Sequence, residues 1–322
     1  MKVLLTGGAG YVGSVAARGL LRLGHEVRVV DALMYGSVGL LGLYGEDRFS
    51  FLRGDIRSAP LMRRALEGID AVVHLAAIVG DPACARQPDV ACDVNRDASL
   101  QLLALSQQQG VQRLVFASTC SNYGTMADAT QYMTEESELR PVSLYAETKV
   151  AVERALLTSS AAAPAVCVLR FATVFGLSPR MRFDLTVNEF TMELLTKRTV
   201  TVYTEHRWRP YVHVRDAARA IGLALDSSIE HIRGQAFNVG ETRHNYQKGQ
   251  LVELIRAQIG NHVTIERVTR PDDPRDYRVL FEKIKRELGF QVDRTVEDGV
   301  REIADAIGQG LFSDCGSPSY RN

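Results

Sequence analysis

Lysine is scarce in this sequence of 322 residues, since six of its 38 basic residues are lysines and the rest are arginines. That bias fits either anionic ligands or codon usage in the source. Basic and acidic residues balance at 38 each, so the charge excess typical of nucleic-acid-binding proteins is missing. The five cysteines are odd in number and show no metal-ligand spacing, which favours reduced thiols and no metal site. No apolar run reaches the length of a membrane span, and no signal peptide precedes the first strand. We therefore expect a cytoplasmic protein with neither nucleic-acid nor membrane partners.

A glycine turn near the start of the chain indicates a dinucleotide site. Lys2 to Thr6 forms a short apolar strand, and apolar residues at helical spacing follow the turn as far as Gly24. In this geometry a pyrophosphate binds the free N–H groups at the helix N-terminus. A second strand, Glu26 to Val30, ends in Asp31, which can accept hydrogen bonds from the adenosine ribose. The alternative is a glycine turn in an unrelated α/β protein.

Alternating strands and helices predict an α/β fold, a Rossmann-type doubly wound parallel sheet with a smaller C-terminal substrate lobe. We assign residues 1–175 to the NAD-binding domain, with 208–239 returning to it. Residues 176–207 and 240–310 form the substrate lobe, and 311–322 form a polar, loosely held tail. Residues 81–88 are expected to be a loop. The residues predicted to bind the cofactor at the carboxyl edge of the sheet are Gly7, Gly10, Tyr11, Val12, Gly13, Asp31, Asp55, Ile56, Leu75, Ala76 and Ala77.

Chemistry is predicted at the same edge of the sheet. A strand over 113–117 runs into Ser118 and Thr119, whose hydroxyls lie where ligands bind in open α/β sheets. Tyr145 and Lys149, four residues apart, share one face of the helix that follows. A tyrosine, with an ordinary pKa near 10, needs a lowered pKa to act as a base at pH 7.

Together these motifs resemble the extended short-chain dehydrogenase/reductases of the nucleotide-sugar epimerase and dehydratase group. The resemblance spans nearly the whole chain, and it includes the segment 209–214 and the loop 270–277. It implies that Tyr145 is the acid/base at a sugar hydroxyl, with its pKa lowered by Lys149 and a positive nicotinamide. Tyr145 and Lys149 also contact the cofactor. The implied catalytic residues are Thr119, Tyr145 and Lys149, and the implied substrate-binding residues are Thr119, Asn188, Arg209, Arg270 and Arg275.

Departures from the family pattern narrow the chemistry. Cys120 and Ser121 stand where the group's dehydratases carry an Asp-Glu pair, which disfavours dehydration. Cys120 is either a proton donor beside a keto group or a small packing residue. Thr173 stands where many relatives carry an asparagine, so the usual contacts there are not carried over.

The sequence thus predicts an NAD-dependent epimerase of a nucleoside-diphosphate sugar, acting at C4 through a transient 4-keto intermediate. NAD is favoured over NADP because Asp31 would repel a 2′-phosphate and no arginine follows in residues 32–35. A 4-ketoreductase using NAD(P)H and a catalytically silent dinucleotide-binding regulator are the alternatives. The resemblance also implies a homodimer paired through the helices over 97–109 and 145–158.

Overall fold

A seven-stranded parallel sheet forms the centre of the molecule. The structure is a computed structural model, and it describes all residues except 127, 129, 160–163, 261 and 270–272. The strand order is β10-β6-β5-β4-β1-β2-β3, which reverses direction between β1 and β4, as in doubly wound folds. The predicted fold class is confirmed. The strands are β1 (Lys2–Thr6), β2 (Glu26–Asp31), β3 (Phe49–Arg53), β4 (Ala71–His74), β5 (Arg113–Thr119), β6 (Ala165–Phe171) and β10 (Gln235–Val239).

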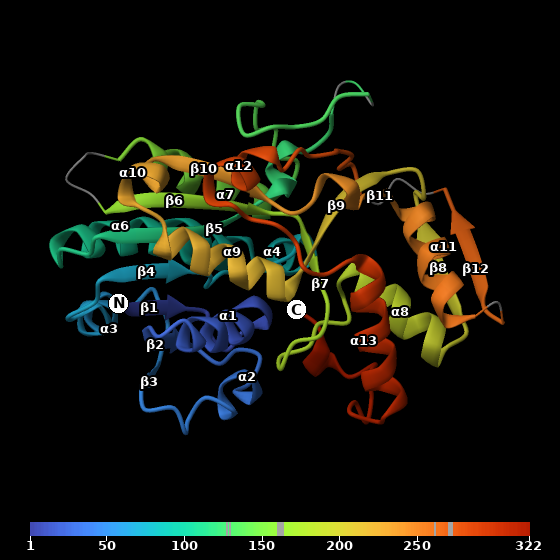
Figure 1. The fold of residues 1–322 in the computed structure, drawn as a ribbon, viewed down its shortest axis with the longest axis horizontal. Coiled ribbons are helices and arrows are strands. Elements are labelled where there is room, and N and C mark those ends of the chain that lie inside the picture. Colours follow the sequence, from blue (N-terminus) through green and yellow to red (C-terminus); the bar gives the residue numbers. More distant parts are fainter. Residues whose placement is uncertain (127, 129, 160–163, 261, 270–272) are drawn as a thin grey trace.

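Helices cover both faces of this sheet because its strands are apolar on both sides (Figure 1). In β1, Val3 and Leu5 pack into one buried cluster and Leu4 into another, as the two-residue period of a strand requires. The first cluster is closed by α1 (Tyr11–Arg22), α9 (Val214–Asp226) and α12 (Glu282–Leu288), and the second by α3 (Ala59–Leu66), α6 (Ala98–Gln108) and α7 (Leu144–Leu157).

The second lobe lies beyond the carboxyl ends of the central strands (Figure 1). It holds two small sheets and three helices around a separate apolar cluster. One sheet joins β7 (Thr173–Phe175), β9 (Trp208–His213) and β11 (Asn245–Gln247), and the other joins β8 (Thr199–Tyr203) and β12 (Thr264–Val268). Its helices are α8 (Thr186–Thr196), α11 (Lys248–Ile259) and α13 (Val296–Gly308). Because β9 pairs with β7 and β11, the chain returns to the core at α9 rather than at residue 208.

Two segments differ from expectation. Residues 81–88, expected as a loop, contain α4 (Asp81–Arg86) and the start of α5 (Pro88–Cys92). Pro82 and Pro88 lie in first turns, where the missing N–H carries no penalty. The segment 311–322 is not loosely held, because the rings of Phe312 and Tyr320 pack edge-on against Phe183 at 5.1 and 5.6 Å.

The remaining described elements are short. They are α2 (Val38–Leu41), α10 (Ile229–Ile232), a π-helical turn over Asp93–Asp97 and 3-10 turns over Cys120–Tyr123, Thr242–His244 and Pro318–Tyr320. Among the described residues, no helix combines the length and apolarity needed to cross a membrane.

Candidate active site

A cavity of about 710 Å³ opens at the carboxyl ends of the central strands, where the two lobes meet. Its size suits a small-molecule site, and residues from both lobes line it. The sequence-predicted residues that line it are Gly7, Gly10, Tyr11, Val12, Gly13, Asp31, Asp55, Ile56, Leu75, Ala76, Ala77, Thr119, Tyr145, Lys149, Arg209 and Arg275. In the described part of the chain, no group of His, Cys, Asp or Glu side chains is arranged to hold a metal ion.

The backbone of the glycine turn, residues 7–13, is here called the glycine cradle, and it has no room for a side chain at Gly7 or Gly13. Gly7 has a φ of +74°, and a Cβ atom there would lie 2.7 Å from the backbone nitrogen of Ala76. A Cβ atom on Gly13 would lie 2.0 Å from the Gly7 carbonyl oxygen. The first turn of α1 contains no acidic residue, so its free N–H groups and positive dipole end face the cavity unopposed. The cradle therefore fits the diphosphate of a dinucleotide.

Two aspartates predicted to bind the cofactor, Asp31 and Asp55, line the cavity. The Asp31 carboxylate accepts hydrogen bonds from the Ala9 and Leu33 backbone nitrogens at 3.0 and 2.8 Å, and burial raises its pKa. These bonds fix the carboxylate at the end of β2. Asp55 pairs with the Arg57 side chain at 2.7 Å, which lowers the Asp55 pKa. Of these two aspartates, Asp31 is the one whose carboxylate forms no ion pair within the described residues.

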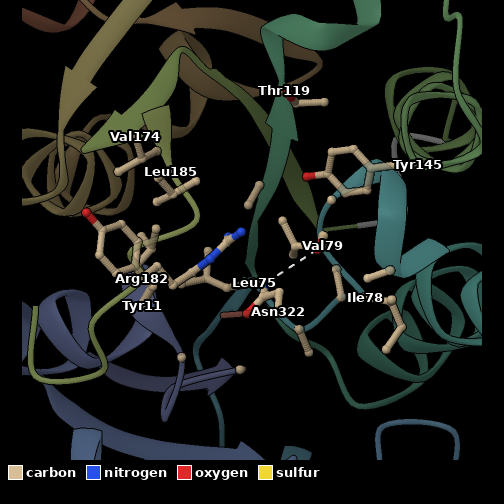
Figure 2. Close-up of a pocket in the computed structure, with 18 of the residues that line it drawn as sticks. Tyr11, Leu75, Ile78, Val79, Thr119, Tyr145, Val174, Arg182, Leu185 and Asn322 are labelled. Atoms are coloured by element: carbon tan, nitrogen blue, oxygen red, sulfur yellow. Dashed lines mark hydrogen bonds between the residues drawn. The ribbon is translucent and has the colours of Figure 1, made fainter. Parts of the chain in front are cut away.

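Helix α7 places the predicted acid/base and its lysine on the cavity wall. Ser143 caps the helix by accepting a hydrogen bond from the Ala146 backbone nitrogen. The Tyr145 hydroxyl points into the cavity (Figure 2). Lys149 Nζ donates to the Ala117 carbonyl oxygen at 2.9 Å and lies 6.0 Å from the Tyr145 ring centre.

Burial acts on both groups of this pair. It lowers the pKa of Lys149 to about 8 and raises the pKa of Tyr145, because a low dielectric disfavours the charged forms. In the protein without cofactor, Lys149 therefore does not bring the Tyr145 pKa below its ordinary value, contrary to our expectation. Arg182 and Arg275 act in the opposite direction to burial but do not outweigh it.

The two hydroxyls at the end of β5 face different ways. Ser118 donates to the buried Glu153 carboxylate at 2.7 Å, within a core network that also contains Arg170. Thr119 accepts from the Ser121 backbone nitrogen at 3.0 Å, so its own O–H is still available as a donor. Thr119 lies on the same side of the cavity as Tyr145 (Figure 2).

Cys120 does not reach the cavity. Its side chain is fully buried, and its Sγ donates to the Arg170 carbonyl oxygen at 3.2 Å. Burial raises the pKa of this thiol, whereas a proton-transfer role would need a lower one. The packing interpretation of Cys120 is therefore the one that fits the structure.

Arg209 and Arg275 line the cavity as a pair organised by Asp273. Each guanidinium contacts that carboxylate at 2.8 Å, and both contacts lower the Asp273 pKa. Arg275 also lies 3.2 Å from Asp81, at the start of α4. The shared carboxylate holds both guanidinium groups in place. Arg270, the third arginine predicted here, lies outside the described residues.

Asn188, expected to bind substrate, does not line the cavity. It is fully buried in α8, where its Nδ2 donates to Tyr11 Oη at 3.1 Å and its Oδ1 accepts from the Gly176 backbone nitrogen at 2.9 Å. The Tyr11 hydroxyl in turn donates to the Gly176 carbonyl oxygen at 2.6 Å. Asn188 therefore joins the second lobe to the cofactor cradle, and its amide is fully used in doing so.

Sequence similarity identifies the family to which the chain belongs. The model of the "NAD dependent epimerase/dehydratase family" matches residues 3–240. The chain belongs to that family. The resemblance inferred from the spaced motifs is thereby confirmed, and NAD, the cofactor predicted from them, is the one in the family's description.

Relatives of this family member include the UDP-glucose 4-epimerase of Corynebacterium glutamicum, 31% identical over 96% of this chain and 97% of the relative. The UDP-glucose 4-epimerase of Streptomyces lividans is 32% identical over 87% of each chain. Among solved structures, the dTDP-glucose 4,6-dehydratase DesIV of Streptomyces venezuelae, with NAD and TYD bound, is 28% identical. Its TM-score is 0.85, with 97% of this chain and 99% of that chain covered. The UDP-glucose 4-epimerase of Thermotoga maritima, with UDP-glucose, gives a TM-score of 0.85 at 27% identity, with 97% and 100% covered.

This member of the family carries cavity residues that the sequence motifs did not identify. Arg182 extends its guanidinium into the middle of the cavity (Figure 2), where Asp184 accepts from it at 3.0 and 2.7 Å. Asn322 donates to the Val79 carbonyl oxygen at 3.3 Å across the same space. Arg180 also lines the cavity. The available signal was the pair Arg180 and Arg182 in a segment without regular helical or strand patterning.

Proposed function

We propose that this protein is an NAD-dependent epimerase that acts on a nucleoside-diphosphate sugar at C4, through a transient 4-keto intermediate. The observation that carries the proposal is the placement of the Tyr145 hydroxyl in the same cavity as the glycine cradle and the pair Arg209 and Arg275. The cradle supplies a dinucleotide site. The arginines supply a second diphosphate site in the same cavity.

Each residue has a definable part in the reaction. Tyr145 takes the proton from the sugar hydroxyl as the carbon is oxidised, and it returns that proton when the ketone is reduced on its other face. Thr119 donates a hydrogen bond to the same sugar oxygen. Lys149, with a pKa of about 8, keeps a positive charge near the phenol at neutral pH. NAD, when bound, accepts and returns the hydride.

Cys120 favours epimerisation over dehydration. Expulsion of a sugar hydroxyl needs an acid at the positions that Cys120 and Ser121 occupy, by the family resemblance. Cys120 is buried with its thiol donating to a backbone carbonyl, and a serine hydroxyl is a poor acid. The similarity to a dTDP-glucose 4,6-dehydratase thus reflects the shared fold and cofactor.

Hydrogen tracking in D₂O tests the proposal. UDP-glucose and dTDP-glucose are incubated with the purified protein, and in parallel a 4-keto sugar nucleotide is incubated with the protein and NADH. Product mass and free-cofactor absorbance are recorded in each case. We expect a C4 epimer without carbon-bound deuterium, because the hydride stays within the site. Deuterium on carbon, or oxidation of reduced cofactor in step with reduction of a 4-keto sugar, would overturn the proposal, the second result in favour of a ketoreductase. Bound NAD with no turnover of either sugar would favour a regulator.

We also propose a cytoplasmic homodimer paired through α6 and α7. The two helices contact one another on one face of the sheet, and the family resemblance supports their role as the interface. The five free cysteines support a reducing compartment. Light scattering on the purified protein should give twice the mass of 35.5 kDa, and a monomer at micromolar concentration would exclude this interface.

A further inference from the structure

Arg180 is a buried cation on the cavity wall whose charge has no matched partner. Its side chain is 5% exposed, and in the described residues no carboxylate lies within 4.0 Å of it. Arg182, Arg209 and Arg275 differ, because each pairs with an aspartate. Burial of an unpaired charge is costly.

The hydrogen bonds of Arg180 leave most of its donors unused. Nη2 donates to the Arg321 carbonyl oxygen at 2.9 Å, while Nε is buried without a partner. A guanidinium has five N–H donors in a planar fork. Burial and the nearby Arg182 lower the Arg180 pKa, and the opposing effects of Asp184 and Tyr35 do not restore it, so the protein compensates this charge only in part. The site is therefore suited to an anion that enters from the cavity.

The position of Arg180 indicates which anion. The guanidinium lies 4.3 Å from the centre of the Tyr35 ring, in the loop that follows Asp31. Ser178, two residues before Arg180, donates to the Tyr11 carbonyl oxygen at 2.7 Å in the first turn of α1. Arg180 is thus held between the adenosine end of the cavity and the N–H groups of the cradle, where the diphosphate of a dinucleotide lies.

We propose that Arg180 binds the diphosphate of the dinucleotide cofactor and supplies the full positive charge that the glycine cradle lacks. The first turn of α1 offers only backbone donors and a partial charge. Arginine adds two parallel N–H donors suited to phosphate oxygens. The residue comes from the loop before α8, so the second lobe contributes directly to cofactor binding. The inference rests on the dinucleotide-binding part of the proposed function and is independent of epimerisation.

Binding measurements on the full chain test this assignment without using turnover. Dissociation constants for NAD, ADP-ribose, NADP and adenosine are compared between the parent protein, freed of bound nucleotide, and Arg180→Gln. We expect NAD and ADP-ribose to bind about 10- to 100-fold more weakly, the range for hydrogen bonds to charged groups. Adenosine, which has no phosphate, should be unaffected. Arg180→Lys keeps the charge and should recover part of the affinity.

Controls separate this role from a structural one. Arg63→Gln removes an exposed arginine outside the cavity and should leave every dissociation constant unchanged. Unchanged NAD affinity in Arg180→Gln, or an equal loss for adenosine, would overturn the assignment. A loss confined to NADP would place the contact at the 2′-phosphate and also reject the diphosphate. If circular dichroism shows that Arg180→Gln does not fold, Arg180→Lys tests the assignment instead. We then expect a smaller loss of affinity for NAD and ADP-ribose and no loss for adenosine. Loss of sugar turnover with normal NAD binding would count against the epimerase alone.

Discussion

Substitution of Gly13 by alanine tests whether the cradle depends on close backbone approach. The new Cβ atom would lie 2.0 Å from the Gly7 carbonyl oxygen and 2.8 Å from the Gly8 Cα atom. Backbone atoms cannot rotate away as a side chain can. Because Cβ contacts below 3.0 Å are essentially never seen, the turn and the start of α1 must separate by at least about 1 Å, the difference between 3.0 and 2.0 Å. Overpacking of this kind costs about 1–3 kcal/mol, and we expect a value near the upper end.

Gly19 provides the matched control in the same helix. A Cβ atom there meets nothing within 4 Å, and alanine is favoured over glycine in a helix interior by about 0.5–1 kcal/mol. Gly19→Ala should therefore increase the free energy of unfolding, whereas Gly13→Ala should decrease it. Urea unfolding followed by circular dichroism measures both, and calorimetric titration with NAD measures the cradle directly. Equal stability and equal NAD affinity for Gly13→Ala and the parent protein would refute the close-approach argument.

Three further predictions concern the catalytic end. Tyr145→Phe should lower sugar turnover by about 10²- to 10⁴-fold, the usual worth of a general acid/base, with NAD affinity nearly unchanged; near-full activity would reject the assignment. Cys120→Ser should keep turnover within a few fold and leave the product free of carbon-bound deuterium, whereas loss of turnover in a folded variant would restore a chemical role for the thiol. Lys149 has a folded-state pKa of about 8, below its ordinary 10.5, so between these values the unfolded chain binds more protons and stability rises with pH. Lys149→Met should reduce that rise between pH 7.5 and 9.5 by about 2 kcal/mol, as measured by urea unfolding at both pH values. An identical pH dependence in the variant would contradict the burial argument.

The parts of the site that sequence could predict are those set by local pattern. The two-residue period of Val3, Leu4 and Leu5 and the glycine spacing of the turn depend on neighbours along the chain, and the strand and cradle agree with them. Four-residue spacing likewise placed Tyr145 and Lys149 on one face of α7.

The roles that sequence could not assign depend on packing between distant segments. The family resemblance implies Asn188 as a ligand, but its amide is used by Tyr11 and Gly176. Cys120 follows Thr119 directly, yet alternation along the strand end turns it toward Arg170. Residues 32–35, next to Asp31 in the sequence, contain no arginine, whereas Arg180 comes from a distant segment and stacks on Tyr35.

The segment 311–322 bears on how long the cofactor stays with the protein. Its backbone accepts a hydrogen bond from Arg180 on one side of the cavity, and Asn322 donates to Val79 on the other. The residues that form these two bonds, Arg321 and Asn322, both line the cavity. We expect a dinucleotide in this cavity to dissociate when the segment opens locally, because Arg321 and Asn322 cross the space it would leave through. We therefore expect NAD to be held as a prosthetic group rather than exchanged as a co-substrate, which would suit the proposed reaction, since it returns its hydride to the molecule that gave it.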